Sequence, residues 1–391
     1  MTGTADLVVR LPRPDSSVED YRLVGTPVAR PTSVPKFNRI AYAAAHVVSD
    51  PRRETDPWNA PAIDWDTTIA FRAHLWSRGF KIAEAMDTAQ RGFGMDWNAT
   101  QELISRTLAA ARATPGADLA CGAGTDQLAP ADARSLDDVI AAYETQIGFI
   151  EAQGGRAILM ASRAMARVAR SPDDYARVYG RILSQARDKV ILHWLGDMFD
   201  PQLAGYWGSD RFDANLRTVL AIIDENRAKV EGIKISLLDN AKEEDLRRRL
   251  PAGVLCFTGD DFNYAELIEG DGIHHSHALL GIFDAIAPSA SSALASLAKD
   301  DVMTFRAVMA PTVPLSRKIF EVPTQYYKAG VVFLAWLNGH QSHFTMPAGM
   351  QSARSTLHYA EIFRLADAAN VLDNPDLAAR RMASLMAVSG V

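Results

Sequence analysis

The feature that most constrains this sequence is a regular alternation of short apolar runs with segments of helical periodicity. Apolar runs of strand length occur near residues 40, 83, 119, 159, 191, 233, 256 and 275. Eight strand–helix units within roughly 250 residues are typical of a (β/α)₈ or TIM barrel. A doubly wound open sheet more often carries a glycine-rich turn after its first strand, and here that strand ends in AHVVSDP, without glycine. The sequence therefore predicts an α/β protein built on a TIM barrel.

Two further regions flank the predicted barrel of residues 37–300. Residues 1–36 contain prolines at 12, 14, 27, 31 and 35. Because proline lacks the amide donor of a regular ladder, this stretch predicts an extended arm or an edge hairpin. Over residues 301–391 the strand pattern stops while helical periodicity continues, punctuated by prolines. This last region is predicted to be a helical appendage.

Charge and composition exclude several classes of protein. The net charge is -6, which argues against a nucleic-acid binder, since duplex affinity comes from clustered Lys and Arg. No apolar run approaches the ~18 residues of a membrane span, and the N-terminal segment has no secretory pattern. Two cysteines, Cys121 and Cys256, rule out a disulfide framework. We therefore expect a cytoplasmic protein that binds a small molecule, with neither nucleic acid nor a membrane as partner.

Several predicted strands carry polar or titratable side chains near their carboxyl ends. Barrel strands are buried on both faces and are normally apolar, and TIM-barrel active sites lie at these ends. This pattern predicts an active site there. The candidates, in strand order, are His46, then Glu84, Asp87 and Thr88, then His193, then Lys234 and Ser236, then Gly259 and Asp260, and last His275 and His277.

Lys234 and His193 are the candidate catalytic residues. Lys234 lies within VEGIKISLLD, and lysine is rarely buried unless it is paired or functional. Desolvation lowers the pKa of an amine, and a neutral amine can form a Schiff base with a ketone. The alternative is a structural lysine that pairs with Asp260 or Asp239 at the rim. His193, in KVILHW, is either a proton shuttle or a hydrogen-bonded core residue.

A metal site is the alternative source of chemistry. His275 and His277 have period-two spacing and share one face of a strand. The candidate ligands of a divalent metal are His46, Glu84, His193, His275 and His277. No helical HExxH or CxxC spacing supports this set.

Four motifs in order resemble one family of TIM barrels, the dihydrodipicolinate synthase and N-acetylneuraminate lyase family of class I aldolase-like enzymes. The similarity covers roughly residues 38–340. The resemblance implies a Schiff-base lysine at position 234, no cofactor, and a homodimer or homotetramer. The matching segments are Gly122-Ala123-Gly124, Gly232-Ile233-Lys234, Thr258-Gly259-Asp260-Asp261 and Gly270-Asp271-Gly272.

Two departures from that family concern the substrate. The family's strand-two motif, Gly-Thr-Thr-Gly-Glu, binds the carboxylate of a 2-keto acid, and here it reads Asp87-Thr88-Ala89-Gln90-Arg91. An acid in place of the first glycine repels a carboxylate, so pyruvate is not the expected donor. The family's strand-five tyrosine aligns with His193. The sequence thus resembles an outlying branch that keeps the lysine and changes the substrate.

Three functions follow as hypotheses. The first is a lyase or aldolase that makes or breaks a carbon–carbon bond of a polar, perhaps sugar-derived, keto compound through a Lys234 Schiff base. In it, the substrate is bound by Asp87, Thr88, Ser236, Gly259, Asp260, His275, His46 and Glu84. The second is a metal-assisted lyase, isomerase or epimerase. The third is a non-catalytic barrel that binds a small molecule.

Overall fold

The computed structural model describes residues 7–29 and 31–391, which form two compact units. The barrel unit comprises residues 39–45 and 81–280. The helical unit comprises residues 46–80 and 281–391 with the described part of residues 1–38. Residues 1–6 and 30 of the predicted arm lie outside the described residues. The predicted domain boundaries near residues 36 and 300 stay predictions.

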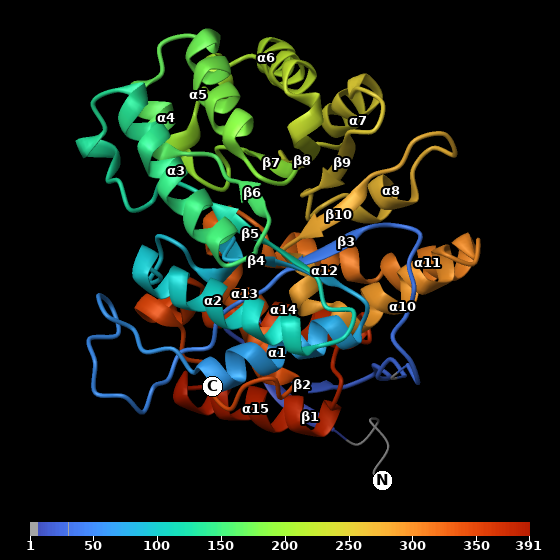
Figure 1. The fold of residues 1–391 in the computed structure, drawn as a ribbon. Coiled ribbons are helices and arrows are strands. Elements are labelled where there is room, and N and C mark those ends of the chain that lie inside the picture. The colour runs from blue at the N-terminus through green and yellow to red at the C-terminus, as the bar shows by residue number, and fades with distance from the viewer. Residues whose placement is uncertain (1–6, 30) are drawn as a thin grey trace. The chain divides into compact units, whose positions relative to one another are not determined.

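The barrel unit is a closed barrel of eight parallel strands among the described residues, which confirms the predicted fold (Figure 1). Each strand pairs with its neighbour in sequence, and the last pairs with the first, in the order β10-β3-β4-β5-β6-β7-β8-β9. The strands are β3 (Ala41–Ala44), β4 (Lys81–Glu84), β5 (Leu119–Ala123), β6 (Ala157–Leu159), β7 (Val190–Leu195), β8 (Val230–Ser236), β9 (Leu255–Thr258) and β10 (His277–Leu280).

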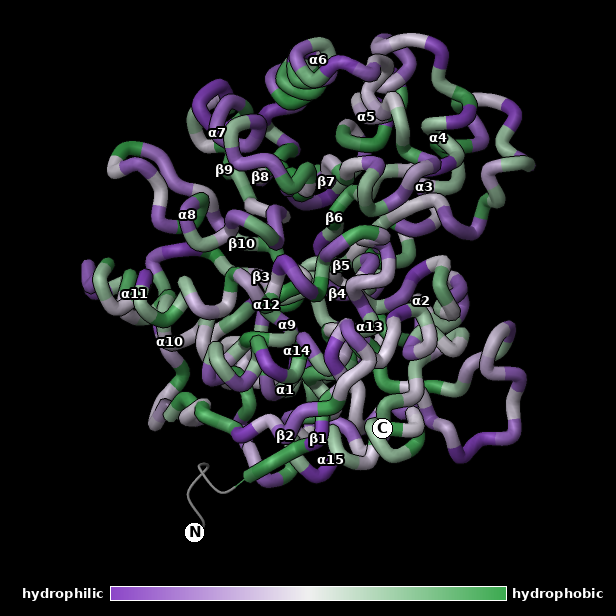
Figure 2. Tube along the Cα trace, turned by 180° about the vertical axis from the view of Figure 1, so that it is seen from behind, coloured by the Kyte–Doolittle hydropathy of each residue, from purple (hydrophilic) through white to green (hydrophobic). Residues whose placement is uncertain are grey.

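Helices of the same unit follow its strands. Helix α7 is hydrophilic along most of its length, whereas the tube at β6 is hydrophobic (Figure 2). The α-helices are α2 (Trp97–Ala113), α3 (Leu136–Ala152), α4 (Arg163–Val168), α5 (Pro172–Gln185), α6 (Phe212–Glu225), α7 (Asn240–Arg249) and α8 (Tyr264–Glu269). Helical periodicity in the sequence indicates the longer of these helices, whereas α4 and α8 have only six residues each.

Side-chain caps explain why the longer helices begin where they do. Ser135 accepts a hydrogen bond from the backbone N–H of Asp138, and the Asp138 carboxylate accepts one from the N–H of Ser135. This capping box starts α3 at the predicted residue. Ser171 and Asp174 form the same arrangement before α5, whose first residue is Pro172.

The barrel interior is apolar at its amino end. Alternate residues of each strand point inward, and a core cluster there includes Tyr42, Ile158, Ile191, Phe257 and Leu279. Because this layer is filled, the pocket that His193 lines lies toward the carboxyl ends of the strands. A chemical site in this barrel is therefore confined to that end.

Outward-facing polar groups tie helices to the barrel strands. Glu243 of α7 is buried and accepts hydrogen bonds from the Thr258 and Ser276 hydroxyls, at 2.9 and 2.7 Å. Burial raises the pKa of Glu243 to about 8, although both hydrogen bonds favour its charged form. This carboxyl group makes the stability of the folded chain depend on pH.

Replacing Glu243 by glutamine is expected to flatten that dependence. Between the ordinary carboxyl value of 4.5 and about 8, the unfolded chain loses a proton that the folded chain keeps, so the free energy of unfolding falls as pH rises. Each unit of difference corresponds to about 1.4 kcal/mol. Urea unfolding at pH 5 and pH 8 measures the change. Glu244→Gln, at a partly exposed neighbour, is the control. An unchanged difference between the two pH values in Glu243→Gln would contradict this assignment.

The helical unit contains a hairpin and most of the C-terminal helices. Strands β1 (Val8–Pro12) and β2 (Val18–Arg22) pair antiparallel. Of the two forms expected for the N-terminal region, an extended arm or an edge hairpin, the structure contains the hairpin. The Asp367 carboxylate accepts hydrogen bonds from the Tyr21 hydroxyl and from the N–H groups of Val24 and Gly25. The helices are α1 (Trp65–Ser77), α9 (Ile282–Ala285), α10 (Ala287–Leu297), α11 (Val302–Met309), α12 (Thr312–Ile319), α13 (Tyr327–Leu337), α14 (Thr356–Ala368) and α15 (Pro375–Val388).

The last barrel strand begins later than the apolar pattern indicates. The sequence predicts a strand over residues 272–279, but β10 begins at His277. The Asp271 carboxylate accepts hydrogen bonds from the N–H groups of Ile273 and His274, which holds this stretch as a turn. His275 therefore precedes the strand, at the amino end of the barrel.

None of the described helices combines the length and apolar character needed to span a bilayer.

Candidate active site

Lys234 lies on the inner face of β8, toward its carboxyl end. Residues 232, 234 and 236 alternate with Ile233 and Ile235, and Lys234 is paired in register with His193 of β7. Its relative exposure is 8%. Burial lowers the pKa of Lys234 below its ordinary value of 10.5, although the charges of Asp87 and Asp261 act to raise it. The lowered pKa increases the fraction of Lys234 that is present as the neutral amine at a given pH.

The structural alternative for Lys234, a rim ion pair, is not what the structure contains. Asp260 accepts hydrogen bonds from the N–H groups of Phe262 and Asn263 and from the Asn263 amide. Asp239 caps α7 and pairs with Lys242 at 3.1 Å. Within the described ranges, no hydrogen bond or salt bridge to the Lys234 amine is found. The amine is thus unpaired within the described residues, and Lys234 is not among the residues that line the pocket at this end of the barrel.

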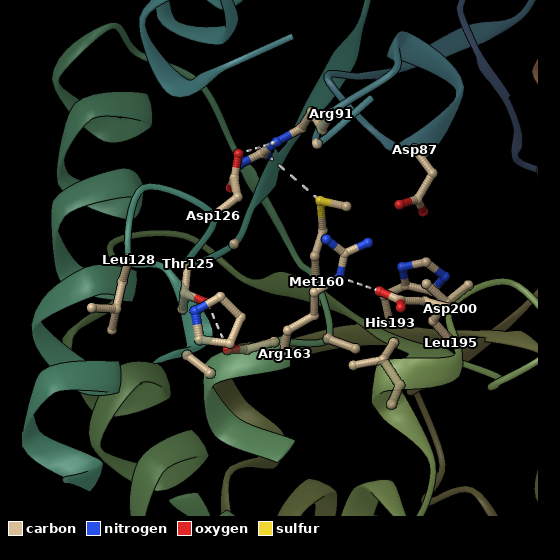
Figure 3. A pocket seen from close by; sticks show the side chains of 17 residues that line it. Asp87, Arg91, Thr125, Asp126, Leu128, Met160, Arg163, His193, Leu195 and Asp200 are labelled. Atoms are coloured by element: carbon tan, nitrogen blue, oxygen red, sulfur yellow. Dashed lines mark hydrogen bonds and ion pairs between the residues drawn. The ribbon is translucent and has the colours of Figure 1, made fainter. Parts of the chain in front are cut away.

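His193 is fully buried beside Lys234, and its ring is directed into a pocket (Figure 3). Its Nε2 lies 3.3 Å from Ser236 Oγ, and its Nδ1 has no hydrogen-bond partner among the described residues. Burial, and secondarily the charge of Lys234, lower the pKa of His193 well below 6.5. The imidazole is therefore neutral at pH 7 and is able to accept a proton.

The loop after β4 supplies a carboxylate. Asp87 opens a single 3₁₀ turn, Asp87–Ala89, and its side chain lines the pocket (Figure 3). Its charge acts on Lys234. Thr88, the next residue of the turn, is buried. The structure thus brings Asp87 to the same end of the barrel as His193 and Lys234.

Gly259, directly after β9, allows close approach to the lysine. A Cβ atom at this position would lie 2.1 Å from Ser236 Oγ and 2.6 Å from Lys234 Cε. Any side chain here would displace the lysine stem or the hydroxyl, so the site requires glycine. Asp260 belongs to the turn that carries Gly259 and faces its own backbone instead of the pocket.

The pocket lies over the carboxyl ends of β4 to β7 and has a volume of about 140 Å³, enough for a small organic molecule. All of its lining residues belong to the barrel unit. Its lining includes five charged side chains: Asp87, Arg91, Asp126, Arg163 and Asp200 (Figure 3). Thr125 and Ser162 add hydroxyls, hydrogen bonded to each other at 2.6 Å.

Sequence reasoning did not select Arg91, Asp126, Arg163 or Asp200 as site residues. Arg163 begins the unpredicted α4, and Asp200 lies in an irregular segment after β7. One signal was present for Asp126, which follows the glycine-rich turn after β5. Each arginine pairs with an aspartate from another loop, a relation that spacing along the chain does not reveal.

Two of the predicted binding residues lie elsewhere. Glu84 faces outward from β4 and accepts hydrogen bonds from the Thr107 hydroxyl of α2, at 2.6 Å, and from the N–H of Ala85. His46 belongs to the helical unit. There its Nδ1 lies 2.8 Å from Asp284 Oδ2, and Asp284 also accepts from its backbone N–H.

The histidines before and at the start of β10 lie at the amino end of the barrel. His277 Nδ1 accepts a hydrogen bond from the N–H of Ile40, which precedes β3. The hypothetical ligand set of His46, Glu84, His193, His275 and His277 is not assembled. Across the residues that the structure describes, no cluster of three or more His, Cys, Asp or Glu side chains is arranged to hold a metal ion.

Fold and site together define a TIM barrel with a buried lysine at the carboxyl ends of its strands. The chain belongs to the family described as "Protein of unknown function (DUF993)", whose model matches residues 9–391. A comparison with curated proteins found no match.

Solved structures of similar fold confirm the predicted resemblance to the dihydrodipicolinate synthase family. Dihydrodipicolinate synthase from Aquifex aeolicus has a TM-score of 0.63 and 10% identity, over 85% of this chain and 99% of that chain. YagE, a prophage protein of that family from Escherichia coli K12 in complex with pyruvate, has a TM-score of 0.63 and 10% identity, over 90% and 98%. The 4-hydroxy-tetrahydrodipicolinate synthase of Methylacidiphilum fumariolicum SolV has a TM-score of 0.58 and 14% identity, over 85% and 99%. At such identity the likeness concerns the fold, and it fits an outlying branch.

Proposed function

We propose that this protein is a lyase of the class I aldolase type, which acts on a polar keto compound through a Schiff base on Lys234. The observation that carries the proposal is the Lys234 amine itself. It is buried on an inward-facing strand position, its pKa is lowered, and it has no hydrogen bond or salt bridge within the described residues. A structural lysine would be expected to have such a partner.

The chemical steps follow from a neutral amine. Lys234 adds to the carbonyl carbon of the substrate, and the carbonyl oxygen leaves as water, which gives an imine. The protonated imine then takes up the electron pair of the bond between the α and β carbons as that bond breaks. The hydroxyl proton on the β carbon passes to a base, and the released fragment is an aldehyde or ketone. The bond cleavage leaves an enamine on Lys234. The enamine takes up a proton at its α carbon and becomes the imine of the second product, and hydrolysis of that imine returns the amine.

His193 is the proposed base. It lies beside Lys234 in the register of β7 and β8, and its lowered pKa keeps the ring unprotonated at neutral pH, the form that a general base requires. Ser236 lies 3.3 Å from His193 Nε2 and orients the ring. Gly259 leaves room for the lysine stem.

Asp87 is proposed to set the kind of ketone that is accepted. Its carboxylate lines the pocket and its charge acts on Lys234. A carboxylate directly attached to the carbonyl carbon, as in pyruvate, would be repelled, whereas a hydroxyl group could donate a hydrogen bond to Asp87. A hydroxyketone of the kind found in sugars fits this wall of the pocket.

Reductive trapping tests the proposal. In separate reactions, the protein is incubated with borohydride together with hydroxyacetone, dihydroxyacetone or pyruvate. The intact mass of the protein is then measured. We expect labelling by the hydroxyketones. Ligand binding to the pocket without labelling by any ketone would favour the non-catalytic barrel instead.

Replacing Asp87 by asparagine is expected to shift the preference toward pyruvate. The substitution removes the negative charge that repels the carboxylate of pyruvate. Labelling by pyruvate should therefore improve about tenfold, which corresponds to about 1.4 kcal/mol. Labelling by hydroxyacetone should change less, because asparagine still accepts a hydrogen bond. The ratio of the two labelling rates is the measurement, and Asp96→Asn, at the cap of α2, is the control. A ratio equal to that of the unmodified protein would contradict the role of Asp87.

Assembly of the protein as a homodimer or homotetramer, which the family resemblance implies, stays a prediction.

A further inference from the structure

Arg163, which lines the pocket, has guanidinium N–H donors that make no hydrogen bond to the described protein groups. Arg163 Nε donates a hydrogen bond to Asp200 Oδ2 at 2.5 Å. Within residues 7–29 and 31–391, neither Nη1 nor Nη2 makes a hydrogen bond. A Cβ atom at Gly92 would lie 3.6 Å from Nη1, so the guanidinium reaches the loop that follows β4. Figure 3 shows the Arg163 guanidinium joined to Asp200 by a dashed line.

Arg91, the other arginine of the pocket, has its donors committed to the protein. Its Nη1 donates to the Gly122 carbonyl at 2.7 Å, and its Nη2 donates to Gln146 Oε1 at 2.7 Å and to Asp126. Its side chain is 4% exposed, whereas that of Arg163 is 34% exposed. Arg91 is therefore part of the wall, and Arg163 is the arginine that is free to bind a ligand.

Asp200 orients Arg163 for this purpose. Its second oxygen, Oδ1, accepts a hydrogen bond from the N–H of Gln202, which fixes the carboxylate on its loop. Because Asp200 accepts a hydrogen bond only from Nε, the N–H donors of the two Nη groups make no hydrogen bond to the described protein groups. The planar guanidinium fork matches the oxygens of a carboxylate or a phosphate.

We infer that Arg163 binds an anionic group, a carboxylate or a phosphate, at a position of the keto substrate remote from its carbonyl. This inference rests on the proposed Schiff base at Lys234. The remote position follows from topology, since Arg163 follows β6 and Lys234 lies on β8, with β7 between them. Two strand spacings place their backbones roughly 10 Å apart. Asp87 disfavours an anion next to the carbonyl. A substrate that is neutral next to its carbonyl and anionic at its remote end is therefore compatible with both Asp87 and Arg163.

Matched pairs of ketones test the inference. Dihydroxyacetone and dihydroxyacetone phosphate differ only in the phosphate, and 5-hydroxy-2-pentanone and 4-oxopentanoate differ only in the carboxylate end. For each compound, the concentration that gives half-maximal borohydride labelling is measured. We expect the anionic member of at least one pair to label at a concentration at least about tenfold lower. The pair that shows the difference identifies the anionic group.

Two variants assign the effect. Arg163→Gln should bring the anionic compound to the level of its neutral partner. Arg167→Gln, one turn later on α4 and exposed, should keep the preference. Equal labelling within both pairs, or a preference that survives in Arg163→Gln, would overturn the inference.

A second readout separates this inference from the proposed function. The change in Tm caused by the same compounds is measured without borohydride. Stabilisation by an anionic compound that is lost in Arg163→Gln, with no labelling of any ketone, would support the anion site and reject the Schiff base. If neither labelling nor an Arg163-dependent Tm shift is found, both fail.

Discussion

Replacing Lys234 by methionine abolishes borohydride labelling and lowers kcat by at least about 10³-fold, because the residual rate without the nucleophile comes from binding and positioning alone. Methionine fills a similar volume without a charge. Since burial lowers the pKa of Lys234, the folded chain gives up a desolvation cost when the amine is removed. The variant should therefore be no less stable than the unmodified protein, which urea unfolding checks.

A matched control and a pH profile make this result specific. Lys328 is also buried, but its amine donates to the Gln325 carbonyl at 3.1 Å, so Lys328→Met should keep the label. Only the neutral amine attacks a carbonyl. Labelling of the unmodified protein should therefore rise with pH, with a midpoint below the ordinary lysine value of 10.5. Full labelling in Lys234→Met would refute the Schiff base.

Replacing His193 by glutamine is expected to lower kcat by about 10²–10⁴-fold, the usual range for loss of a general base. The amide keeps a polar group in the buried site but does not take up a proton near neutral pH. In the unmodified protein, activity should fall as acid protonates His193. Because its pKa is lowered, this loss should occur below pH 6.5.

The acid limb of the pH profile is the readout that a merely structural role would not change. It should disappear in His193→Gln, since the remaining activity no longer depends on that proton. His275→Gln, at an exposed histidine near the amino end of the barrel, should keep both the rate and the limb. The account of His193 fails if kcat and the acid limb are the same in His193→Gln as in the unmodified protein.

The fold could be predicted from the sequence because each strand and each long helix has a pattern of its own. Ser135 and Ser171 mark the starts of their helices by local hydrogen bonds, which the adjacent residues alone determine. The pairing of Lys234 with His193 was also foreseeable, since both follow from the strand order of a barrel. These features depend on neighbours in sequence or on one topology.

The prediction of the site was less accurate for residues whose position depends on which face of a strand they occupy or on where a strand begins. Glu84 follows the inward-facing Ala83 and therefore points outward, toward Thr107. His275 was assigned to a strand that begins two residues later, so it lies at the opposite end of the barrel from the pocket. A shift of one or two residues in a strand changes the face or the end at which a side chain lies.

The pocket's ion pairs could not be predicted from spacing. Arg163 meets Asp200, which is 37 residues later, and Arg91 meets Asp126, which is 35 residues later. Each contact joins loops after different strands. It depends on the conformation of two loops that follow neighbouring strands, and no periodicity records it.

The central claim is that Lys234 forms a covalent imine with a ketone, and one measurement tests it most directly. The protein is reduced with borohydride in the presence of dihydroxyacetone and digested, and the peptide that contains Lys234 is weighed and fragmented. The account predicts a mass gain equal to that of the ketone less one oxygen atom, located on Lys234. A peptide of unchanged mass, or the same gain on a different lysine, would contradict it.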